Sequence, residues 1–548
     1  MTPDAQEARA AQGASVVLLT LCAGQFLMAL DSSVMNVSIA TVADDLHTSV
    51  TGIQTAIVLY TLVMAMLMVT GGKIGSMIGR KRAFTIGLII YCSGSLTTAL
   101  APNLGVLLLG WSLLEGIGAA LIMPAIVALV AGNFAPEGRP RAYGLVGAAS
   151  AIAIAVGPLI GGLATTYASW RWVFAGEVVI GVGIFLFSRR IADEPVEDPA
   201  HLDFLGSVLW ALGMGLAIFG VLRSGEWGWV IANDGAPAVF GRLSPVIFLI
   251  LGGLVAIWLF MRHVRRLEAA GREPLVTPSL FNNKQMTGGL VMFFFQFVVM
   301  MGLFFVIPLY LSVALGLSAI DTGIKITPLS ITMLIAAAGI PKFFPTVSPR
   351  RVVELSLVAA VLGIVLLFSA MDVNASAAIV TGPLLLIGLA MGGLASQLGS
   401  VTVSAVSDEE SPEVGGLQNT ATQFGASLGT ALAGSVLIAA LSASFFSGIS
   451  EDPAVPPEVV SQASVELASG VPFISDADLE TALQDAGVDA TTTQAILDVN
   501  EQSRLDGLRS ALALLAIIGM IGLLFAKNIP QQQPGSSPAG EGSVRDDP

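Results

Sequence analysis

The stretch VVLLTLCAGQFLMALDSSVMNVSIAT, residues 16–41, decides the fold because it is an apolar run whose one charged residue is Asp31. Apolar runs of about 18 to 27 residues recur nearly end to end along the chain. A helix of about 20 apolar residues crosses the ~30 Å hydrocarbon core of a bilayer. The sequence therefore predicts an all-α integral membrane protein with many spans.

The composition supports this interpretation and excludes other classes of protein. Of 548 residues, 54% are hydrophobic and 12% are charged, with a mean hydropathy of +0.81, whereas soluble domains carry about 25% charged residues. The net charge of −14 argues against a nucleic-acid partner. The two cysteines lie inside apolar runs and the three histidines are scattered, so they do not suggest a metal site. The sequence has no phosphate-binding loop, so nothing indicates that ATP powers the protein. We expect no enzyme activity, no metal and no cofactor.

Fourteen spans are predicted, with edges good to a few residues. They lie at roughly 16–41, 50–71, 84–101, 104–131, 142–165, 172–188, 204–222, 245–261, 286–313, 322–340, 352–370, 376–404, 416–441 and 508–526. With the N-terminus inside, 19 of 25 basic residues fall on the cytoplasmic side, as the positive-inside rule requires. An even number of spans then places both termini in the cytoplasm.

Two stretches outside the predicted spans stand out. Residues 442–507 form an acidic outer loop whose one basic residue is Arg504. The sequence pattern of this loop predicts two short capped helices, one after Ser475 and one over Thr491–Leu497. We interpret this loop as a solvated cap, with a cation-attracting vestibule as the alternative. The tail 527–548 is rich in Gln, Pro, Gly and Ser and is predicted to be disordered.

Three acids lie within predicted spans, where an ionised group costs at least ~2.5–3.5 kcal/mol. They are Asp31, Glu115 and Glu177. Loss of water disfavours the charged form of a carboxyl group, so each is a candidate to load and release a proton, and Asp31 and Glu115 also to attract a cationic substrate. The alternatives are a permanently protonated carboxyl group between helices or, for Glu177, a side chain that snorkels to the outer surface.

Further polar residues within spans are candidates for substrate binding. Gln25 and Asn36 lie in the first span, and Gln296 lies among six phenylalanines. An aromatic wall with one amide suits a bulky apolar or cationic ligand. The alternative is that these aromatic side chains face lipid.

Glycine-rich stretches at two places carry a resemblance to a known family. GKIGSMIGRKR at 72–82 is a tight turn with a basic cluster, in which we single out Gly72, Gly79 and Arg80; GPLIGG at 157–162 contains Gly157, Pro158, Gly161 and Gly162. With Leu30–Asn36, Trp170–Phe174 and Gly415–Thr420, they resemble the fourteen-span drug:proton antiporter branch of the major facilitator superfamily.

That resemblance implies an architecture and an activity. It implies an N-terminal six-helix bundle over 16–188 after a cytoplasmic segment 1–15, a linker region 189–285 with two inserted helices, and a C-terminal bundle over 286–526. It also implies a central cavity, alternating access and a proton gradient as the energy source.

The chain departs from the family pattern near the expected coupling site. The loop signature normally has an acid at Ser76 and a base at Met77, and the fourth span normally has an arginine at Ser112. Glu115 and Glu177 replace a glutamine and an asparagine of the family pattern. One base is lost and two acids are gained, so we hypothesise that coupling depends on Asp31 and Glu115 with a preference for cationic cargo.

We therefore predict a proton-coupled exporter of hydrophobic, cationic drugs or toxic metabolites in the plasma membrane. Its expected partners are the small substrate, protons and the lipid bilayer, and we expect a monomer. One alternative keeps the fold but makes the protein a lipid or metabolite exporter or an uncoupled facilitator. The other is a membrane sensor or scaffold that uses the acidic loop.

Overall fold

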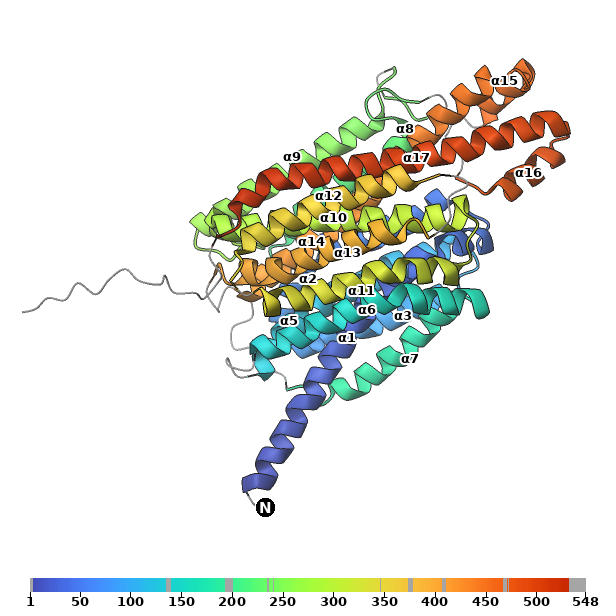
Figure 1. The fold of residues 1–548 in the computed structure, drawn as a ribbon. Coiled ribbons are helices and arrows are strands. Elements are labelled where there is room, and N and C mark those ends of the chain that lie inside the picture. Colours follow the sequence, from blue (N-terminus) through green and yellow to red (C-terminus); the bar gives the residue numbers. More distant parts are fainter. Residues whose placement is uncertain are drawn as a thin grey trace, which may run out of the picture.

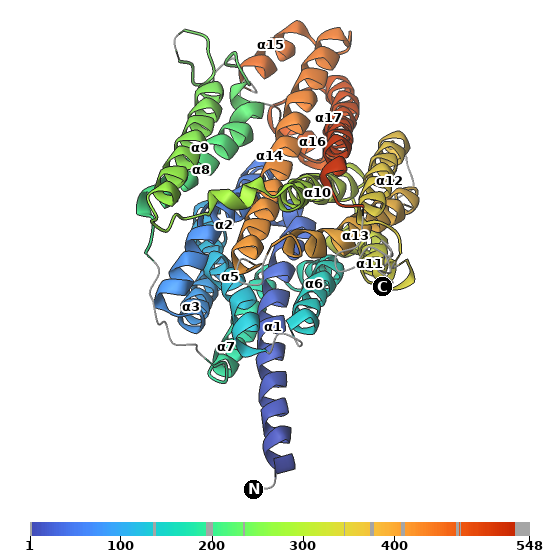
Figure 2. The same cartoon turned by 90° about the vertical axis from the view of Figure 1, so that its left-hand side faces the viewer.

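The computed structural model describes residues 3–531 except 135–138, 193–200, 234–235, 240, 345, 373–377, 407–410, 467–470 and 472. Long helices run side by side through one bundle, and α1 extends beyond it at its N-terminal end (Figure 1, Figure 2). The N-terminal helices are α1 (Pro3–Asp45), α2 (Val50–Ile78), α3 (Arg80–Ala99), α4 (Leu104–Leu107), the π-helical segment η1 (Leu108–Glu115), α5 (Gly116–Asn133), α6 (Arg139–Tyr167) and α7 (Arg171–Ser188).

The remaining helices include two long ones that link the halves. These are α8 (Phe204–Trp227) and α9 (Pro245–Ala269), followed by the short η2 (Pro278–Asn282). The C-terminal helices are α10 (Lys284–Leu309), η3 (Tyr310–Ala314), α11 (Ala319–Phe343), α12 (Pro349–Ala370), α13 (Thr381–Val403), α14 (Ser411–Glu451), α15 (Pro457–Glu466), α16 (Asp476–Asp485), α17 (Ala490–Phe525) and η4 (Ala526–Asn528).

Thirteen helices of the described part are long and apolar enough to cross a membrane. The predicted span at 84–101 is α3, which packs against α5 and α7 but begins with Arg80, Lys81 and Arg82 and contains several Ser and Thr residues. Counting α3 gives the predicted fourteen. The all-α membrane fold is therefore confirmed.

The outer loop differs from the prediction in its helix lengths. Ser475 caps α16 as predicted, since its hydroxyl accepts a hydrogen bond from the Asp478 N–H at 3.2 Å. The second predicted helix is present and capped, by Asp489, but it is not short, because Thr491–Leu497 is the first part of α17, which continues without a break into the last predicted span. Hydropathy marks where a helix leaves the apolar core, whereas the helix itself ends only at a cap or breaker.

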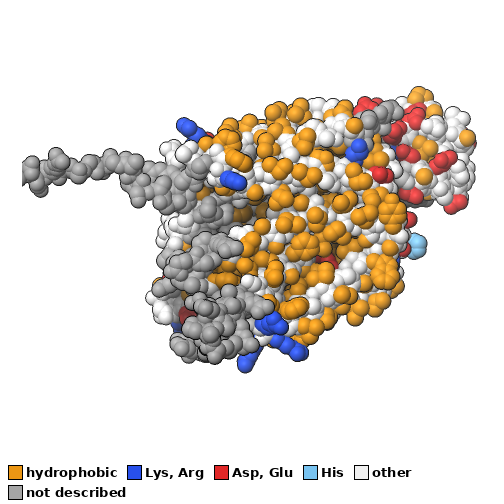
Figure 3. Space-filling model, turned by 60° about the horizontal axis from the view of Figure 1, so that its bottom comes forward, with side chains coloured by type: hydrophobic (Ala, Val, Ile, Leu, Met, Phe, Trp, Pro, Cys, Tyr) orange, Lys and Arg blue, Asp and Glu red, His pale blue; other side chains and the backbone are white. Residues whose placement is uncertain are grey.

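Arg504 fixes this outer region to the membrane bundle. Its side chain is 1% exposed, pairs with Asp476 and donates to the carbonyl oxygen of Ile474 at 3.0 Å. Figure 3 shows acidic side chains gathered at the end of the molecule that bears α15 and α16, beyond a broad hydrophobic belt. The belt is what a lipid-facing surface requires.

Two seams join the N-terminal and C-terminal halves on the side away from the N-terminus. In the first, α6 meets α11, because a Cβ atom at Gly162 would lie 2.7 Å from the Ala319 carbonyl oxygen. In the second, α2 meets α14, where the Gln54 amide donates to the Thr430 carbonyl oxygen at 3.1 Å. The close backbone approach of the first seam is possible because Gly162 has no side chain.

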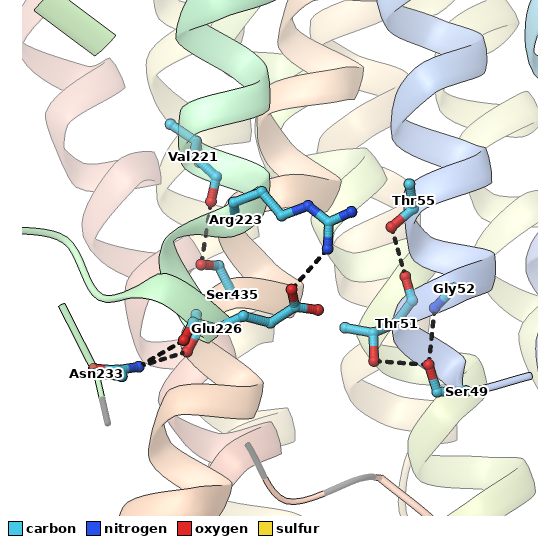
Figure 4. A network of polar contacts seen from close by, with 10 residues as sticks. Ser49, Thr51, Gly52, Thr55, Val221, Arg223, Glu226, Asn233 and Ser435 are labelled. Carbon is cyan, nitrogen blue, oxygen red and sulfur yellow. Dashed lines mark hydrogen bonds and ion pairs between the residues drawn. The ribbon is translucent and has the colours of Figure 1, made fainter. Parts of the chain in front are cut away.

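The helix α8 covers the second seam. Its Ser224 hydroxyl lies 2.6 Å from the Ser435 hydroxyl of α14, and Trp210 donates to the Ala65 carbonyl oxygen of α2 at 3.3 Å. Figure 4 shows the outer end of this contact, where Ser435 bonds to the Val221 carbonyl oxygen beside the Arg223–Glu226 ion pair. The inserted helix thus packs on both halves at once.

On the opposite side, an ion pair ties α2 to the segment after α9. The Lys73 ammonium group donates to Glu273 at 2.8 Å, and this hydrogen bond lowers the pKa of Glu273. Its contribution is therefore present above the ordinary carboxyl pKa and is lost as the pH falls through the lowered pKa. Glu273 is largely exposed, so the pair contributes little.

The α6–α11 seam predicts a cost for any side chain at Gly162. The substitution Gly162→Val should lower the free energy of unfolding by about 1–3 kcal/mol, because its Cβ atom meets backbone that cannot rotate away. The control is Gly183→Val on α7, where nothing lies within 4 Å of an added Cβ atom. Unfolding by SDS in mixed micelles measures both, and equal stability of the two variants would contradict the seam.

Candidate functional site

Three acids from three separate helices meet inside the N-terminal half. Asp31 lies in α1, Glu115 ends η1, and Glu177 lies in α7. One carboxylate oxygen from each lies within 4.8 Å of the other two, and each residue is at most 1% exposed. We call these three residues the acid cluster.

Uncharged donors surround the acid cluster. The Trp111 indole N–H donates to Asp31 at 2.8 Å, and the Thr98 hydroxyl donates to Glu115 at 3.1 Å. Glu177 accepts hydrogen bonds from Tyr91 at 3.0 Å and Ser95 at 2.7 Å. Each acid thus has one oxygen held by neighbouring side chains.

The second oxygen of each acid has no hydrogen-bond partner among the described residues. These atoms are Asp31 Oδ2, Glu115 Oε2 and Glu177 Oε1, and the buried Tyr60 hydroxyl is also unpartnered. Tyr60 stacks on Trp111 with ring centroids 5.1 Å apart. Unpaired polar atoms away from water are costly, so the arrangement is poised to take up protons or another ligand.

Local backbone features bring these side chains together. Residues 108–115 are π-helical, a rare geometry that is frequent at functional sites, and this segment supplies both Trp111 and Glu115. On α3, Gly94 lets Glu115 approach, since a Cβ atom there would lie 2.6 Å from Glu115 Cγ. The site therefore depends on a small residue and on an irregular turn.

No lysine, arginine or histidine of the described residues forms an ion pair with these acids. Burial without a counter-ion favours uncharged carboxyl groups over a cluster of negative charge. The alternative in which Glu177 snorkels outward is wrong, because its side chain is buried and bonded to α3.

A separate cavity lies between the two halves. It has a volume of about 210 Å³, which is smaller than the ~300–1,000 Å³ of typical small-molecule sites. Its described lining is uncharged and combines amides, hydroxyls, methionines and phenylalanines, among them Gln25, Asn36, Met123, Phe297 and Gln423.

Of the predicted binding residues, two line the cavity, two belong to the acid cluster and one lies in neither place. Gln25 and Asn36 line the cavity, as do Phe293, Phe297 and Phe304 of the phenylalanine-rich stretch. Gln296 does not line it, since its buried amide donates to the Met391 carbonyl oxygen of α13 at 3.2 Å. Asp31 and Glu115 do not line it either, because both are buried in the acid cluster.

The cluster and the cavity are nonetheless adjacent. Asp31 faces the cluster while its neighbour Ser32 lines the cavity, and Tyr60 and Thr61 of α2 divide in the same way. Successive residues of a helix point about 100° apart. One layer of helix therefore separates the two sites.

The first glycine-rich stretch forms the predicted tight turn. Gly79 links α2 to α3 at a φ of 101°, a conformation that favours glycine. Arg80 donates to the Ala128 carbonyl oxygen of α5 at 3.2 Å, and Gly72 lies against Pro124 of the same helix. The turn thus holds the ends of three helices together.

The second glycine-rich stretch, in α6, contacts helices on both of its sides. Gly157 and Gly161 face Ser33 and Val34 of α1. Gly162 and the Pro158 carbonyl oxygen face Ala319 and Gly323 of α11. The motif is therefore the place where α1 is coupled through α6 to the C-terminal half.

Sequence reasoning missed the donors of the acid cluster. Tyr91, Ser95, Thr98 and Trp111 were not singled out, although polar side chains inside apolar runs were a visible signal. Ser112, where the resemblance expects an arginine, donates to the Ala56 carbonyl oxygen of α2 at 2.8 Å. That position ties η1 to α2.

Comparison with known sequences identifies relatives over most of the chain. The sequence profile of the Major Facilitator Superfamily matches residues 21–430. A puromycin resistance protein of Streptomyces alboniger is 30% identical over 432 residues, 78% of this chain and 82% of that protein. A tetracenomycin C resistance and export protein of Streptomyces glaucescens is 28% identical over 424 residues, 76% of this chain and 74% of that protein.

Solved structures share the fold. A bacterial homologue of the human lysosomal transporter Spinster, inward-facing and unoccupied, has a TM-score of 0.58 at 14% identity and covers 96% of this chain and 99% of that one. A D-xylose–proton symporter has a TM-score of 0.53 at 12% identity and covers 77% and 90% of the two chains. These relatives are transporters rather than enzymes.

The hydrogen bond from Trp111 to Asp31 predicts an energetic coupling between η1 and α1. Trp111→Phe should lower the free energy of unfolding by about 1–3 kcal/mol, because a buried acceptor loses its donor. The loss should be smaller when Asp31→Leu has already removed the acceptor, and SDS titration of the four proteins measures this difference. Trp172→Phe, at a side chain that is 67% exposed, is the control; additive losses would contradict the coupling.

Proposed function

Because the chain belongs to the Major Facilitator Superfamily, we propose that it exports small hydrophobic compounds across the plasma membrane in exchange for protons. The observation that carries this proposal is the buried acid cluster one helix layer away from the cavity. Relatives named as resistance and export proteins support the direction of transport.

Proton exchange follows from the chemistry of the cluster. Each acid has one oxygen bonded to a donor and one without a partner. Protonation turns an unpartnered oxygen into an O–H donor, from which the oxygen of a neighbouring carboxyl group can accept a hydrogen bond. Loss of protons instead leaves buried like charges that repel one another. The protonated and deprotonated clusters therefore favour different arrangements of α1, η1 and α7.

Cargo binding is linked to this equilibrium through shared helices. Cargo in the cavity contacts α1 beside Ser32 and α2 beside Thr61, one residue away from Asp31 and Tyr60. If cargo and protons favour different states, each lowers the affinity for the other by the same factor. Alternation between states open to each side then exchanges one for the other.

The cavity favours recognition by aromatic and amide contacts. Phenylalanine and methionine side chains offer apolar surface, and amides such as Gln25, Asn36 and Gln423 offer hydrogen bonds. The cationic preference expected from sequence required Asp31 and Glu115 to face the cargo, and neither lines this cavity. The charge of the cargo is therefore a variable in the experiment below.

An uncoupled facilitator of the same fold is the second candidate function. Ser112 favours it, because an uncharged side chain bonded to α2 stands where the family pattern has an arginine associated with proton coupling. Such a carrier would move cargo without moving protons.

The test uses proteoliposomes with an imposed pH gradient, an internal fluorescent pH reporter and matched neutral, cationic and anionic hydrophobic compounds. We expect cargo-evoked proton movement, reduced at least about tenfold in Asp31→Asn and Glu115→Gln, because each removes a proton-binding oxygen. Glu226→Gln is the control, since this acid pairs with Arg223 outside the acid cluster.

Two results would contradict proton coupling. One is cargo flux without proton movement in the unmodified protein, which favours the facilitator. The other is a folded Glu115→Gln variant whose transport keeps its pH dependence. A preference for one charge class in the panel defines the cargo.

A sensor or scaffold that acts through the acidic outer loop is tested separately. Replacing α15 (Pro457–Glu466) by about eight Gly/Ser residues keeps the chain connected and leaves the pair of Arg504 with Asp476 in place. An exporter should retain at least about half of its transport rate, because the cavity is unaltered. Loss of cargo flux from a correctly folded, membrane-inserted variant would favour a role for the loop.

A further inference from the structure

The acid cluster needs positive charge that the described protein does not supply. Three carboxyl groups lie within 4.8 Å of one another, and the ionisable side chains that face them from neighbouring helices are Tyr60, Tyr91 and Cys92. All three of these carry a proton and no charge in their ordinary form. Neutrality therefore requires three protons, or fewer protons and a bound cation.

The unpartnered atoms belong to the same group of buried side chains. Asp31, Glu115 and Glu177 each have one oxygen without a partner, and the Tyr60 hydroxyl, which forms no well-aligned hydrogen bond, lies next to Asp31 and interacts electrostatically with all three acids. Four hard oxygen donors on α1, α2, η1 and α7 thus lie together, completely buried. Oxygen donors of this kind select hard cations.

The charge and dryness of the site determine which cation fits. Calcium takes about six to eight oxygen ligands, and magnesium retains several waters in an octahedral shell. Four buried oxygens supply neither arrangement. The desolvation penalty of an ion rises with its charge, which favours a monovalent ion, and sodium or lithium is small enough for oxygens less than 4.8 Å apart.

We propose that the acid cluster is also a sodium site, in which one Na⁺ replaces one of the protons and is held by the free oxygens of Asp31, Glu115 and Glu177 with the Tyr60 hydroxyl. This departs from the expectation that the chain has no metal site. It deepens the proposed function, since it names a second ion that can occupy the coupling cluster, but binding itself does not depend on export.

Competition with protons gives the proposal a quantitative signature. A cation that takes the place of one proton must release that proton when it binds. The half-saturating Na⁺ concentration should therefore rise about tenfold for each pH unit by which the solution is acidified, as long as the exchange is one for one. A non-specific effect of ionic strength has no such dependence.

The experiment measures ²²Na⁺ binding to the full-length protein in detergent micelles, with choline chloride to keep ionic strength constant. Intrinsic tryptophan fluorescence is a second readout, because Trp111 donates directly to Asp31. We expect saturable binding that Li⁺ competes for and that K⁺ does not, with the tenfold pH dependence given above.

Two variants separate binding from folding. Glu177→Gln should abolish binding, and Tyr60→Phe should weaken it by about tenfold or more, since it removes one oxygen and keeps the ring that stacks on Trp111. Glu226→Gln, outside the cluster, should bind Na⁺ as the unmodified protein does.

Absence of saturable ²²Na⁺ binding would overturn the proposal. So would Tyr60→Phe and Glu177→Gln variants that are as stable as the unmodified protein and bind Na⁺ as tightly as it does. Proton-driven cargo flux in sodium-free liposomes, with no ²²Na⁺ binding, would leave proton coupling standing and reject only the sodium site. Sodium binding without any cargo-evoked proton movement would support the sodium site and reject proton-coupled export.

Discussion

The burial of three carboxyl groups without a counter-ion is the constraint on which the rest of this structure depends. Asp31, Glu115 and Glu177 are tolerated because four neighbouring side chains from α3 and η1 donate hydrogen bonds to them. An ionised group inside a membrane is costly, so a site of this kind persists only where its helices hold those donors in place. The packing of the N-terminal helices therefore determines the chemistry of the site, because it holds the hydrogen-bond donors beside the acids.

Hydropathy predicts the membrane fold well because the spans are long and strongly apolar. It fails where a helix continues after its apolar run ends. The helix α14 extends to Glu451 and α17 begins at Ala490, since capping and the absence of breakers, rather than hydropathy, decide where a helix stops. The same limit affects α3, whose basic start and polar residues lower its apolar character although it packs within the bundle.

The acids of the site could be identified from sequence, but their meeting could not. A charged residue in an apolar run is visible in any single span, whereas its partners depend on how each helix is rotated about its axis. The π-helical segment at 108–115 changes that rotation locally, and the sequence pattern does not predict this segment. The three acids meet at one site, whereas Gln296 does not reach its predicted one. Its phenylalanine neighbours line the cavity, but its own amide bonds to α13.

One turn of α1 joins the parts that an exchange cycle must link. Asp31 enters the acid cluster, Ser32 lines the cavity, and Ser33 and Val34 lie against the α6 glycines, so each face of this turn has a different neighbour. The same α6 motif touches α11 through Gly162. A small shift of α1, caused by a change of charge in the cluster, would therefore alter the cavity and the seam together, because close-packed interfaces repack between discrete states rather than deform gradually.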